Sequence, residues 1–215
     1  MISKKFKQID HWVFDLDNTL YPPEVCLFDQ IEIRMTEWIS TRLSISRHEA
    51  NILREAYWKK YGTSLAGLMR EHNIEPEDYL TYVHDISFSN LKQNPLLKDL
   101  ITALPGRKIV YTNGTVPYAK NVLLALDLDS IFDHVYGVEN ANYFPKPEKQ
   151  AYELIFSKDE LDPLKSAMFE DESRNLRVPH LLGMTTIFVS PNFKYENFID
   201  FHTRNLSGFL KHILN

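Results

Sequence analysis

The segment around which this chain is organised is Trp12-Val13-Phe14-Asp15-Leu16-Asp17-Asn18-Thr19-Leu20. An apolar run of β-favouring residues stops at Asp15 and gives way to polar residues, which predicts a buried strand that ends there. In open α/β sheets the reacting groups lie just beyond the carboxyl ends of the strands. Asp15 therefore stands where a reacting group is expected, and Asp17 is close enough to reach the same ligand.

An Asp-x-Asp pair also occurs in solvated turns and in calcium loops. Counted from Asp15, a calcium-binding EF-hand loop needs Gly at its sixth position and Glu at its twelfth, where this chain has Leu20 and Cys26. A second Asp-Leu-Asp, residues 127–129, follows a helical pattern and is interpreted as a loop at a helix end. The preceding strand thus separates the first pair from the second.

Composition limits the classes of protein to which this chain can belong. Its 215 residues suit one sizeable domain or a domain with a large insertion. The net charge of −5 comes without a run of Lys and Arg that would indicate a nucleic acid polymer as partner. Too few apolar residues follow the basic start for a signal peptide, and no segment has membrane-spanning length, so we expect a cytoplasmic protein without a membrane partner. The single cysteine, Cys26, excludes an internal disulfide and a cysteine-clustered zinc site. The oligomeric state stays open.

Residues 22–93 show helical periodicity and no convincing strand. One apolar stripe recurs at steps of three and four residues: Phe28, Ile31, Met35, Trp38 and Ile39. Ser46 and Glu49 form the pattern of a capping box for a second helix through Tyr57, and Pro76 suits the first turn of a helix running toward Leu91. We therefore predict a small helical domain, residues 22–93, inserted after the first strand.

From residue 94 the pattern alternates between strand and helix. Strands are predicted at residues 107–112, 134–137, 166–169 and 185–189, with an edge strand at residues 197–201. Pro117 and Pro147 are predicted to open helices, Gly183 to end one, and Thr203 to cap the terminal helix. This alternation predicts an α/β fold, a Rossmann-like parallel sheet with right-handed crossovers, made of residues 1–21 plus 94–215.

Three further strand ends carry polar groups that would meet beside Asp15. Thr112-Asn113-Gly114 offers a hydroxyl and backbone N–H groups as an anion cradle, Lys146 offers a positive charge, and Glu170-Asp171 adds two carboxylates. Each alone has an ordinary alternative: a strand-end residue, a surface cation or an exposed turn acid. Together they place four acids in one cleft, where they would repel each other strongly unless a cation held them.

Hard oxygen ligands of this kind suit Mg²⁺, and phosphoryl transfer requires such a set: a nucleophile, a metal, a cation for the phosphate oxygens and an acid for the leaving oxygen. The known nucleotide loops are absent. Gly62 and Gly67 have the spacing of a Walker loop, but Leu68 stands where that loop requires Lys, and no G-x-G-x-x-G occurs.

These motifs, in this order and at these strand ends, resemble those of the haloacid dehalogenase-like (HAD) hydrolase superfamily. The resemblance implies that Asp15 is a nucleophile that forms an aspartyl-phosphate, and that Asp17 is the acid–base residue whose backbone carbonyl also binds Mg²⁺. By the same resemblance, Thr112 and Asn113 hold phosphate, Lys146 steadies Asp15 and phosphate, and Asp171 ligates the metal. Glu170 replaces the Asp of many members, and the inserted helices resemble the cap that closes over such sites.

Asp17 distinguishes activities within this superfamily, because the dehalogenase subgroup generally lacks it. The segments Asp15–Pro22 and Tyr57–Leu68 resemble the pyrimidine 5′-nucleotidase branch. Tyr61 and Ser64 in the second segment are predicted to contact substrate. The alternative is that this segment is the core of the cap and that Gly62 ends a helix.

The sequence thus predicts a Mg²⁺-dependent phosphomonoester hydrolase whose substrate is a small phosphorylated metabolite, with pyrimidine nucleoside 5′-monophosphates favoured. Two alternatives stay open within enzymes: a phosphatase or a mutase for another small ester such as a sugar phosphate. A third, of a different class, is a non-catalytic phosphate-binding protein.

Overall fold

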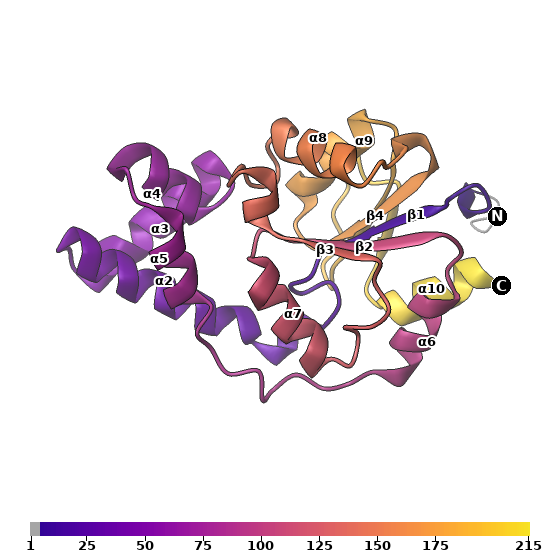
Figure 1. The fold of residues 1–215 in the computed structure, drawn as a ribbon, viewed down its shortest axis with the longest axis horizontal. Coiled ribbons are helices and arrows are strands. Elements are labelled where there is room, and N and C mark those ends of the chain that lie inside the picture. Colours follow the sequence, from indigo (N-terminus) through magenta and orange to yellow (C-terminus); the bar gives the residue numbers. More distant parts are fainter. Residues whose placement is uncertain (1–4) are drawn as a thin grey trace.

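A computed structural model describes residues 5–215 and is centred on a parallel sheet (Figure 1). Within these residues the sheet has six strands in the order β3-β2-β1-β4-β5-β6. The strands are β1 (His11–Phe14), β2 (Arg107–Tyr111), β3 (His134–Tyr136), β4 (Ser166–Glu170), β5 (Thr185–Val189) and β6 (Phe201–Thr203). The predicted Rossmann-like α/β fold is therefore confirmed.

Both faces of the sheet are buried. Successive residues of each strand point to opposite sides, and apolar residues on both sides are covered. In β1, Val13 belongs to one apolar cluster and Phe14 to the other, and in β4 the same holds for Met168 and Phe169. Helices cover the two faces in separate layers (Figure 1). One layer contains α6 (Pro95–Ala103), α7 (Val116–Ala125) and α10 (Leu206–Leu214), and the other α8 (Lys149–Lys158) and α9 (Arg177–Leu181).

A group of helices lies beyond the carboxyl ends of the strands, between β1 and α6 in sequence (Figure 1). It consists of α2 (Leu27–Leu43), α3 (Arg47–Tyr61), α4 (Ser64–His72) and α5 (Pro76–Val83), which we call the helical lobe. The capping box that opens α3 is present: the Ser46 hydroxyl accepts from the Glu49 amide at 3.2 Å, and the Ser46 amide donates to the Glu49 carboxylate at 2.9 Å. The limits predicted for a separate domain, residues 22 and 93, stay a prediction.

The helix that begins at Pro76 is shorter than predicted. It ends at Val83, and no helix follows it as far as Leu91. The following segment contains Ser87 and Ser89, and the Ser87 hydroxyl accepts from the Ser89 amide at 3.3 Å. Side-chain bonds to the backbone of this kind compete with a helical ladder, so this segment offers an alternative to continued helix.

Three predictions for the core are corrected. Pro147 lies ahead of α8, which begins at Lys149 after Glu148 as its N-terminal cap residue. The edge strand was predicted at residues 197–201, but the structure has it at β6, residues 201–203. Just before it, the Asp200 side chain turns back and accepts from the Thr186 amide at 3.0 Å. Asn205, rather than Thr203, caps α10, since its side chain accepts from the Gly208 amide at 2.9 Å.

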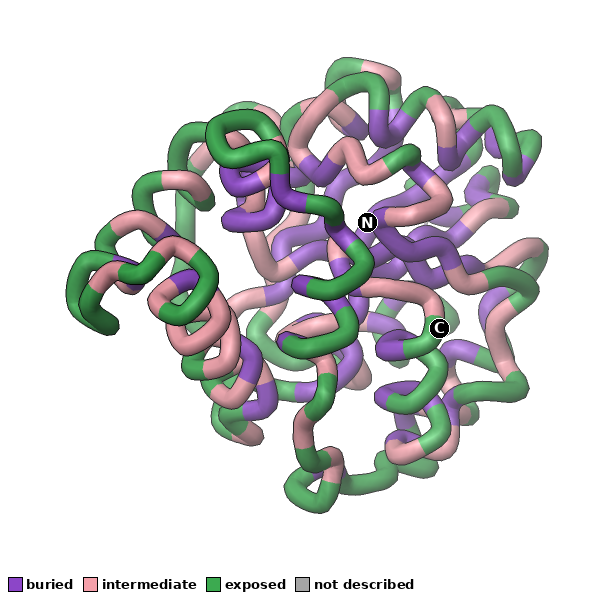
Figure 2. The backbone as a smooth tube through the Cα atoms, turned by 60° about the vertical axis from the view of Figure 1, so that its left-hand side comes forward, coloured by how far each residue is buried: buried purple, intermediate pink, exposed green. Residues whose placement is uncertain are grey.

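The distribution of burial separates the two parts of the molecule. Figure 2 shows buried backbone gathered at the sheet, whereas the helical lobe carries many exposed and intermediate residues. None of the helices in residues 5–215 combines the length and the apolar character needed to cross a membrane.

Candidate active site

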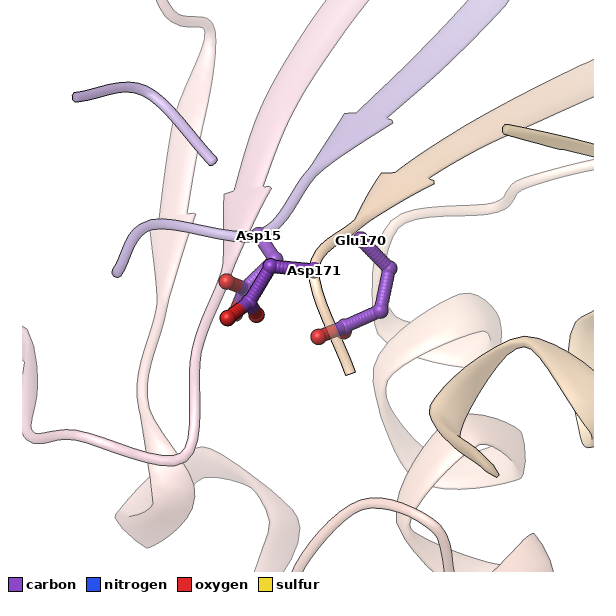
Figure 3. A group of neighbouring side chains, drawn as sticks. All are labelled: Asp15, Glu170 and Asp171. Atoms are coloured by element: carbon purple, nitrogen blue, oxygen red, sulfur yellow. The ribbon is translucent and has the colours of Figure 1, made fainter. Parts of the chain in front are cut away.

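The sheet reverses its winding direction between β1 and β4, which are neighbours although β2 and β3 lie between them in sequence. A crevice outside the carboxyl ends of the strands is expected at such a switch point. Asp15 follows β1, while Glu170 ends β4 and Asp171 comes next. The three side chains come together there (Figure 3), with one carboxylate oxygen of each within 4.8 Å of the others.

Asp15 is fixed in backbone and side chain. Its amide donates to the carbonyl of Phe169 at 2.9 Å, which extends the β1–β4 pairing by one residue. Its Oδ1 accepts from Lys146 Nζ at 2.6 Å, and its Oδ2 accepts a longer bond of 3.3 Å from the Thr19 hydroxyl. Oδ1 is therefore tied to a cation, and Oδ2 is the freer oxygen.

Lys146 is buried with three acceptors around its ammonium group. Nζ donates to Asp15 and to Glu170 Oε2, each at 2.6 Å, and to the carbonyl of Tyr111 at 3.0 Å. Burial favours the neutral amine, but the carboxylates of Asp15 and Glu170 outweigh that effect and raise the pKa of Lys146 above its ordinary value. The side chain thus stays cationic at the floor of the crevice.

The segment after β2 supports this lysine. The Asn113 side chain holds the backbone of Lys146 at both ends: Oδ1 accepts from its amide at 2.8 Å, and Nδ2 donates to its carbonyl at 3.1 Å. The buried hydroxyl of Thr112 accepts from the Gly114 amide at 2.9 Å, which fixes the turn. The side chain of Asn113 therefore positions Lys146, a role that the sequence did not indicate.

The acidic cluster has more negative charge than Lys146 can neutralise. Burial, followed by the charge of Asp15, raises the pKa of Glu170 to about 7 and that of Asp171 well above its ordinary value. Carboxylates that resist ionisation in this way, with oxygens within reach of one another, fit a hard divalent cation. The donor set is therefore one that could hold Mg²⁺.

Glu170 and Asp171 differ in how far their oxygens are already used. Glu170 Oε2 accepts from Lys146, and its Oε1 accepts from the Glu172 amide at 3.2 Å. Within residues 5–215, the Asp171 side chain accepts one hydrogen bond, from Asn18 Nδ2 to its Oδ2 at 3.3 Å. Asp171 is thus the freer ligand of the two.

Two tyrosines hold Asp17, and both were missed in the sequence. The hydroxyls of Tyr21 and Tyr118 each donate to Asp17 Oδ1 at 2.6 Å. Burial, and then the charge of Asp15, raise the pKa of Asp17 to about 6 against these hydrogen bonds. The Tyr118 ring is itself stacked on His84, with centroids 4.4 Å apart. Tyr21, four residues beyond Asp17, could have been found from its spacing, whereas Tyr118 could not.

A cavity of about 490 Å³ opens above these groups and extends between the core and the helical lobe. The predicted core residues that line it are Asp15, Asp17, Thr112, Asn113, Lys146, Glu170 and Asp171. Residues from α2, α3, α4 and α5 form further parts of its walls. The structure thus brings every predicted core site residue to one cavity.

The two residues predicted in the helical lobe lie in different environments. Ser64 lines the cavity, although its buried hydroxyl donates to the carbonyl of Arg54 at 3.1 Å. Tyr61 is not among the residues that line the cavity, and its hydroxyl donates to Glu71. The structure therefore brings Ser64, and not Tyr61, to the site.

The turn after α3 lies directly against the core. Gly62 ends the helix with a φ of 92°, and a Cβ at this position would lie 2.9 Å from the carbonyl oxygen of Lys146. Arg174, from the core, donates to the carbonyls of Trp58 at 2.8 Å and Gly62 at 3.0 Å. Glycine is therefore needed both for the backbone angle and for the close approach.

Comparison with known proteins gives a family and a fold. Residues 9–178 match the family model described as haloacid dehalogenase-like hydrolase. A relative from Saccharomyces cerevisiae, Phosphate metabolism protein 8, is 25% identical in an alignment of 201 residues that covers 86% of this chain. The aligned part spans 63% of that relative's length.

Solved structures share the fold at low sequence identity. A HAD phosphatase from Thermococcus onnurineus has a TM-score of 0.63 at 18% identity, with 95% of this chain and 98% of that chain covered. The HAD-hydrolase YfnB from Bacillus subtilis, bound to magnesium, has a TM-score of 0.62 at 17% identity, with 97% and 100% covered.

Proposed function

This chain belongs to the haloacid dehalogenase-like hydrolases, and we propose that its reaction is the Mg²⁺-dependent hydrolysis of a phosphomonoester through an aspartyl-phosphate. The observation that carries the proposal is the pairing of two differently held carboxyl groups. Asp15 is bound by a buried ammonium group, and Asp17 is held by two hydroxyls with a pKa raised to about 6. Two neighbouring carboxyl groups that are held in such different environments are typical of a nucleophile and an acid–base residue.

In the first step Asp15 Oδ2 attacks phosphorus, since Oδ1 is bound to Lys146. The bond from phosphorus to the leaving oxygen breaks, and Asp17 gives its proton to that oxygen. In the second step Asp17, now a carboxylate, takes a proton from water as the water oxygen attacks phosphorus. Phosphate leaves and the Asp15 carboxylate is restored.

The remaining groups of the site would stabilise charge during these steps. Lys146 and the segment Thr112–Gly114 would bind the phosphate oxygens. Asp15, Asp171 and the carbonyl of Asp17 would hold Mg²⁺, with Glu170 acting through Lys146 or water. When bound, the ion supplies positive charge that offsets the phosphate and the acidic cluster. The Bacillus subtilis protein of similar fold is bound to magnesium, which supports Mg²⁺ as the choice of ion.

Asp17 favours a phosphatase over a dehalogenase. A halide leaves as a stable anion and needs no proton, whereas an alkoxide leaving from a phosphate ester does. The hydroxyls of Tyr21 and Tyr118 hold the Asp17 carboxyl group in a fixed position, as a residue that transfers a proton requires. A purely phosphate-binding protein would likewise need neither a nucleophile nor an acid.

The proposed substrate is a nucleoside monophosphate, with pyrimidine nucleotides favoured, and the proposed setting is the cytoplasm. A cavity of about 490 Å³ has room for a leaving group of this size above the acidic cluster. A sugar phosphate would also fit, and a mutase would use the same core.

Turnover of phenyl phosphate, with and without Mg²⁺, tests the reaction class. We expect phosphate release that depends on Mg²⁺, and a set of phosphorylated metabolites should then include nucleoside monophosphates among the fastest substrates. Absence of turnover with every ester in the presence of Mg²⁺ would contradict the proposal. A sugar phosphate faster than any nucleotide would contradict only the substrate class.

Asp17→Asn should affect substrates according to their leaving groups. Loss of a general acid typically costs about 10²- to 10⁴-fold when the leaving oxygen is basic. We expect a loss of that size on a nucleoside monophosphate and a smaller one on 4-nitrophenyl phosphate, whose leaving group needs little protonation. The acylphosphate should also accumulate, because Asp17 no longer activates water. Equal losses on the two esters without a trapped intermediate would make Asp17 a structural or metal-site residue.

A further inference from the structure

The direction of the Asp17 carboxyl group depends on Tyr118, which lies 101 residues away in sequence. The hydroxyls of Tyr118 and Tyr21 both donate to Asp17 Oδ1 at 2.6 Å. An oxygen that accepts two hydrogen bonds is not the one that carries the proton of a carboxyl group, so Oδ2 carries it when Asp17 is protonated. The position of the Tyr118 hydroxyl therefore helps to set where Asp17 can deliver its proton.

The ring of Tyr118 is covered by His84, the residue that ends α5 of the helical lobe as its C-terminal cap. The two rings are stacked, with centroids 4.4 Å apart and planes at 12°. The Thr115 hydroxyl accepts from the Tyr118 amide at 3.3 Å and lies 3.3 Å from His84 Nδ1, so it joins both residues. The His84 amide donates to the carbonyl of Leu80 at 3.2 Å, which fixes His84 to α5.

The core holds the Tyr118 ring from another side. A Cβ at Gly114 would lie 2.7 Å from Cδ1 of this ring, so the backbone there is already in close contact with it. His84 lines both the active-site cavity and a second cavity of about 480 Å³, which Tyr118 also lines. Loss of the imidazole would therefore enlarge the open space beside Tyr118 and let its ring shift.

His84 contributes the face of its ring and not a charge. Burial lowers the pKa of His84 to about 4, so the imidazole is neutral at neutral pH. It contacts the Tyr118 ring and the Thr115 hydroxyl. A phenyl ring at this position could cover Tyr118 in the same way.

We propose that His84 is a positioning residue for proton transfer: its ring holds Tyr118, and the Tyr118 hydroxyl holds Asp17. The inference rests on the proposed function, since it assigns how the acid–base residue is kept in place. A small displacement of a group that transfers a proton lowers the rate, because the transfer requires a short and aligned contact with the leaving oxygen.

His84→Ala tests this assignment with two esters of nearly equal shape. Phenyl phosphate releases a more basic oxygen than 4-nitrophenyl phosphate and so depends more on the proton of Asp17. We expect kcat/KM for phenyl phosphate to fall by about 5- to 10-fold, the size typical of losing one aromatic pair. The value for 4-nitrophenyl phosphate should fall by less than about twofold. Equal losses on the two esters would overturn the inference.

His84→Phe separates stacking from direct action of the imidazole on the substrate. Phenylalanine keeps a flat ring against Tyr118 but has no nitrogen. We therefore expect it to restore the wild-type ratio of the two kcat/KM values to within about twofold. A ratio as far from wild type as that of His84→Ala would overturn the inference, because a nitrogen of His84 would then be required.

His72→Ala is the matched control. His72 Nε2 lies 2.8 Å from the Tyr57 hydroxyl, and the ring centroids are 5.9 Å apart, so these residues form a second His–Tyr pair in the lobe. Neither is among the residues that line the active-site cavity. The substitution should leave the ratio unchanged. A change equal to that of His84→Ala would overturn the inference, since any weakening of the lobe would then produce it.

Tyr118→Phe shows whether His84 acts through the hydroxyl. Phenylalanine removes the bond to Asp17 and keeps the ring. In this background, adding His84→Ala should change the ratio of the two kcat/KM values by less than about twofold, because the link to Asp17 is already lost. Effects of the two substitutions that simply multiply would overturn the inference.

Crystal structures of the wild type, His84→Ala and His84→Phe test the same contact without turnover. We expect the Tyr118 hydroxyl to bind Asp17 in the wild type and in His84→Phe, and to be displaced or split between two conformers in His84→Ala. This result is expected even if no ester is hydrolysed, an outcome that would contradict the phosphatase and not the positioning of Asp17. An unmoved Tyr118 in His84→Ala would overturn the inference.

Discussion

Asp15→Asn should reduce kcat by on the order of 10⁴- to 10⁶-fold, as expected for loss of a covalent nucleophile. The amide is a far poorer nucleophile than a carboxylate, although it has nearly the same shape. Its oxygen can still accept from Lys146, and the backbone bond to Phe169 is unaffected. The protein should therefore stay folded while phosphoenzyme formation is lost.

The measurement combines steady-state turnover with quenched-flow trapping of the phosphoenzyme. Asp127→Asn is a suitable control, because Asp127 begins the other Asp-Leu-Asp of the chain and lies in the turn after α7 with a φ of 58°. It forms an ion pair with Lys98 at 2.8 Å and should leave kcat unchanged. Substantial turnover by a folded Asp15→Asn protein would rule out Asp15 as the nucleophile.

Removal of Mg²⁺ should abolish turnover. Asp171→Asn should weaken Mg²⁺ binding by about 100-fold or more. This loss is larger than the 10- to 100-fold loss typical of residues that only support metal ligands. The substitution removes an anionic side chain that accepts a single hydrogen bond, from Asn18, in the part of the chain that the structure describes. A titration of activity against Mg²⁺ after chelation measures both effects. Restoration of wild-type activity by added Mg²⁺ is the control for damage by the chelator.

The same substitution should stabilise the metal-free protein at neutral and alkaline pH. The pKa of Asp171 is raised well above its ordinary value in the fold, chiefly by burial and then by the charges of Asp15 and Glu170. Between the ordinary pKa of Asp and this raised pKa, the folded state binds more protons than the unfolded state. The free energy of unfolding therefore falls as the pH rises through this range. Asparagine does not ionise, so the variant does not lose this stability. The temperature of unfolding of metal-free Asp171→Asn should therefore exceed that of the wild type.

Glu170→Gln separates the roles of the two neighbouring acids. We expect a smaller loss of Mg²⁺ affinity than in Asp171→Asn, because both Glu170 oxygens already accept hydrogen bonds, from Lys146 and from the Glu172 amide. A much larger loss in Glu170→Gln would reverse the assignment of the metal ligands.

The sequence by itself determined the sheet and the location of the reacting groups. Buried parallel strands leave continuous apolar runs, and the polar residues that end them mark the carboxyl edge. Because parallel strands bring their carboxyl ends to one edge, Asp15, Thr112 and Asp171 could be placed together although they are far apart in sequence. The capping box of Ser46 and Glu49 was equally predictable, since it depends on local spacing alone.

The tertiary structure alone decided what each polar side chain contacts. Tyr118 reaches Asp17 across 101 residues, Asn113 holds the backbone of Lys146, and Tyr61 turns to Glu71 instead of the cavity. Periodicity gives the apolar face of a helix, but the position of a side-chain tip depends on how the helix packs against its neighbours.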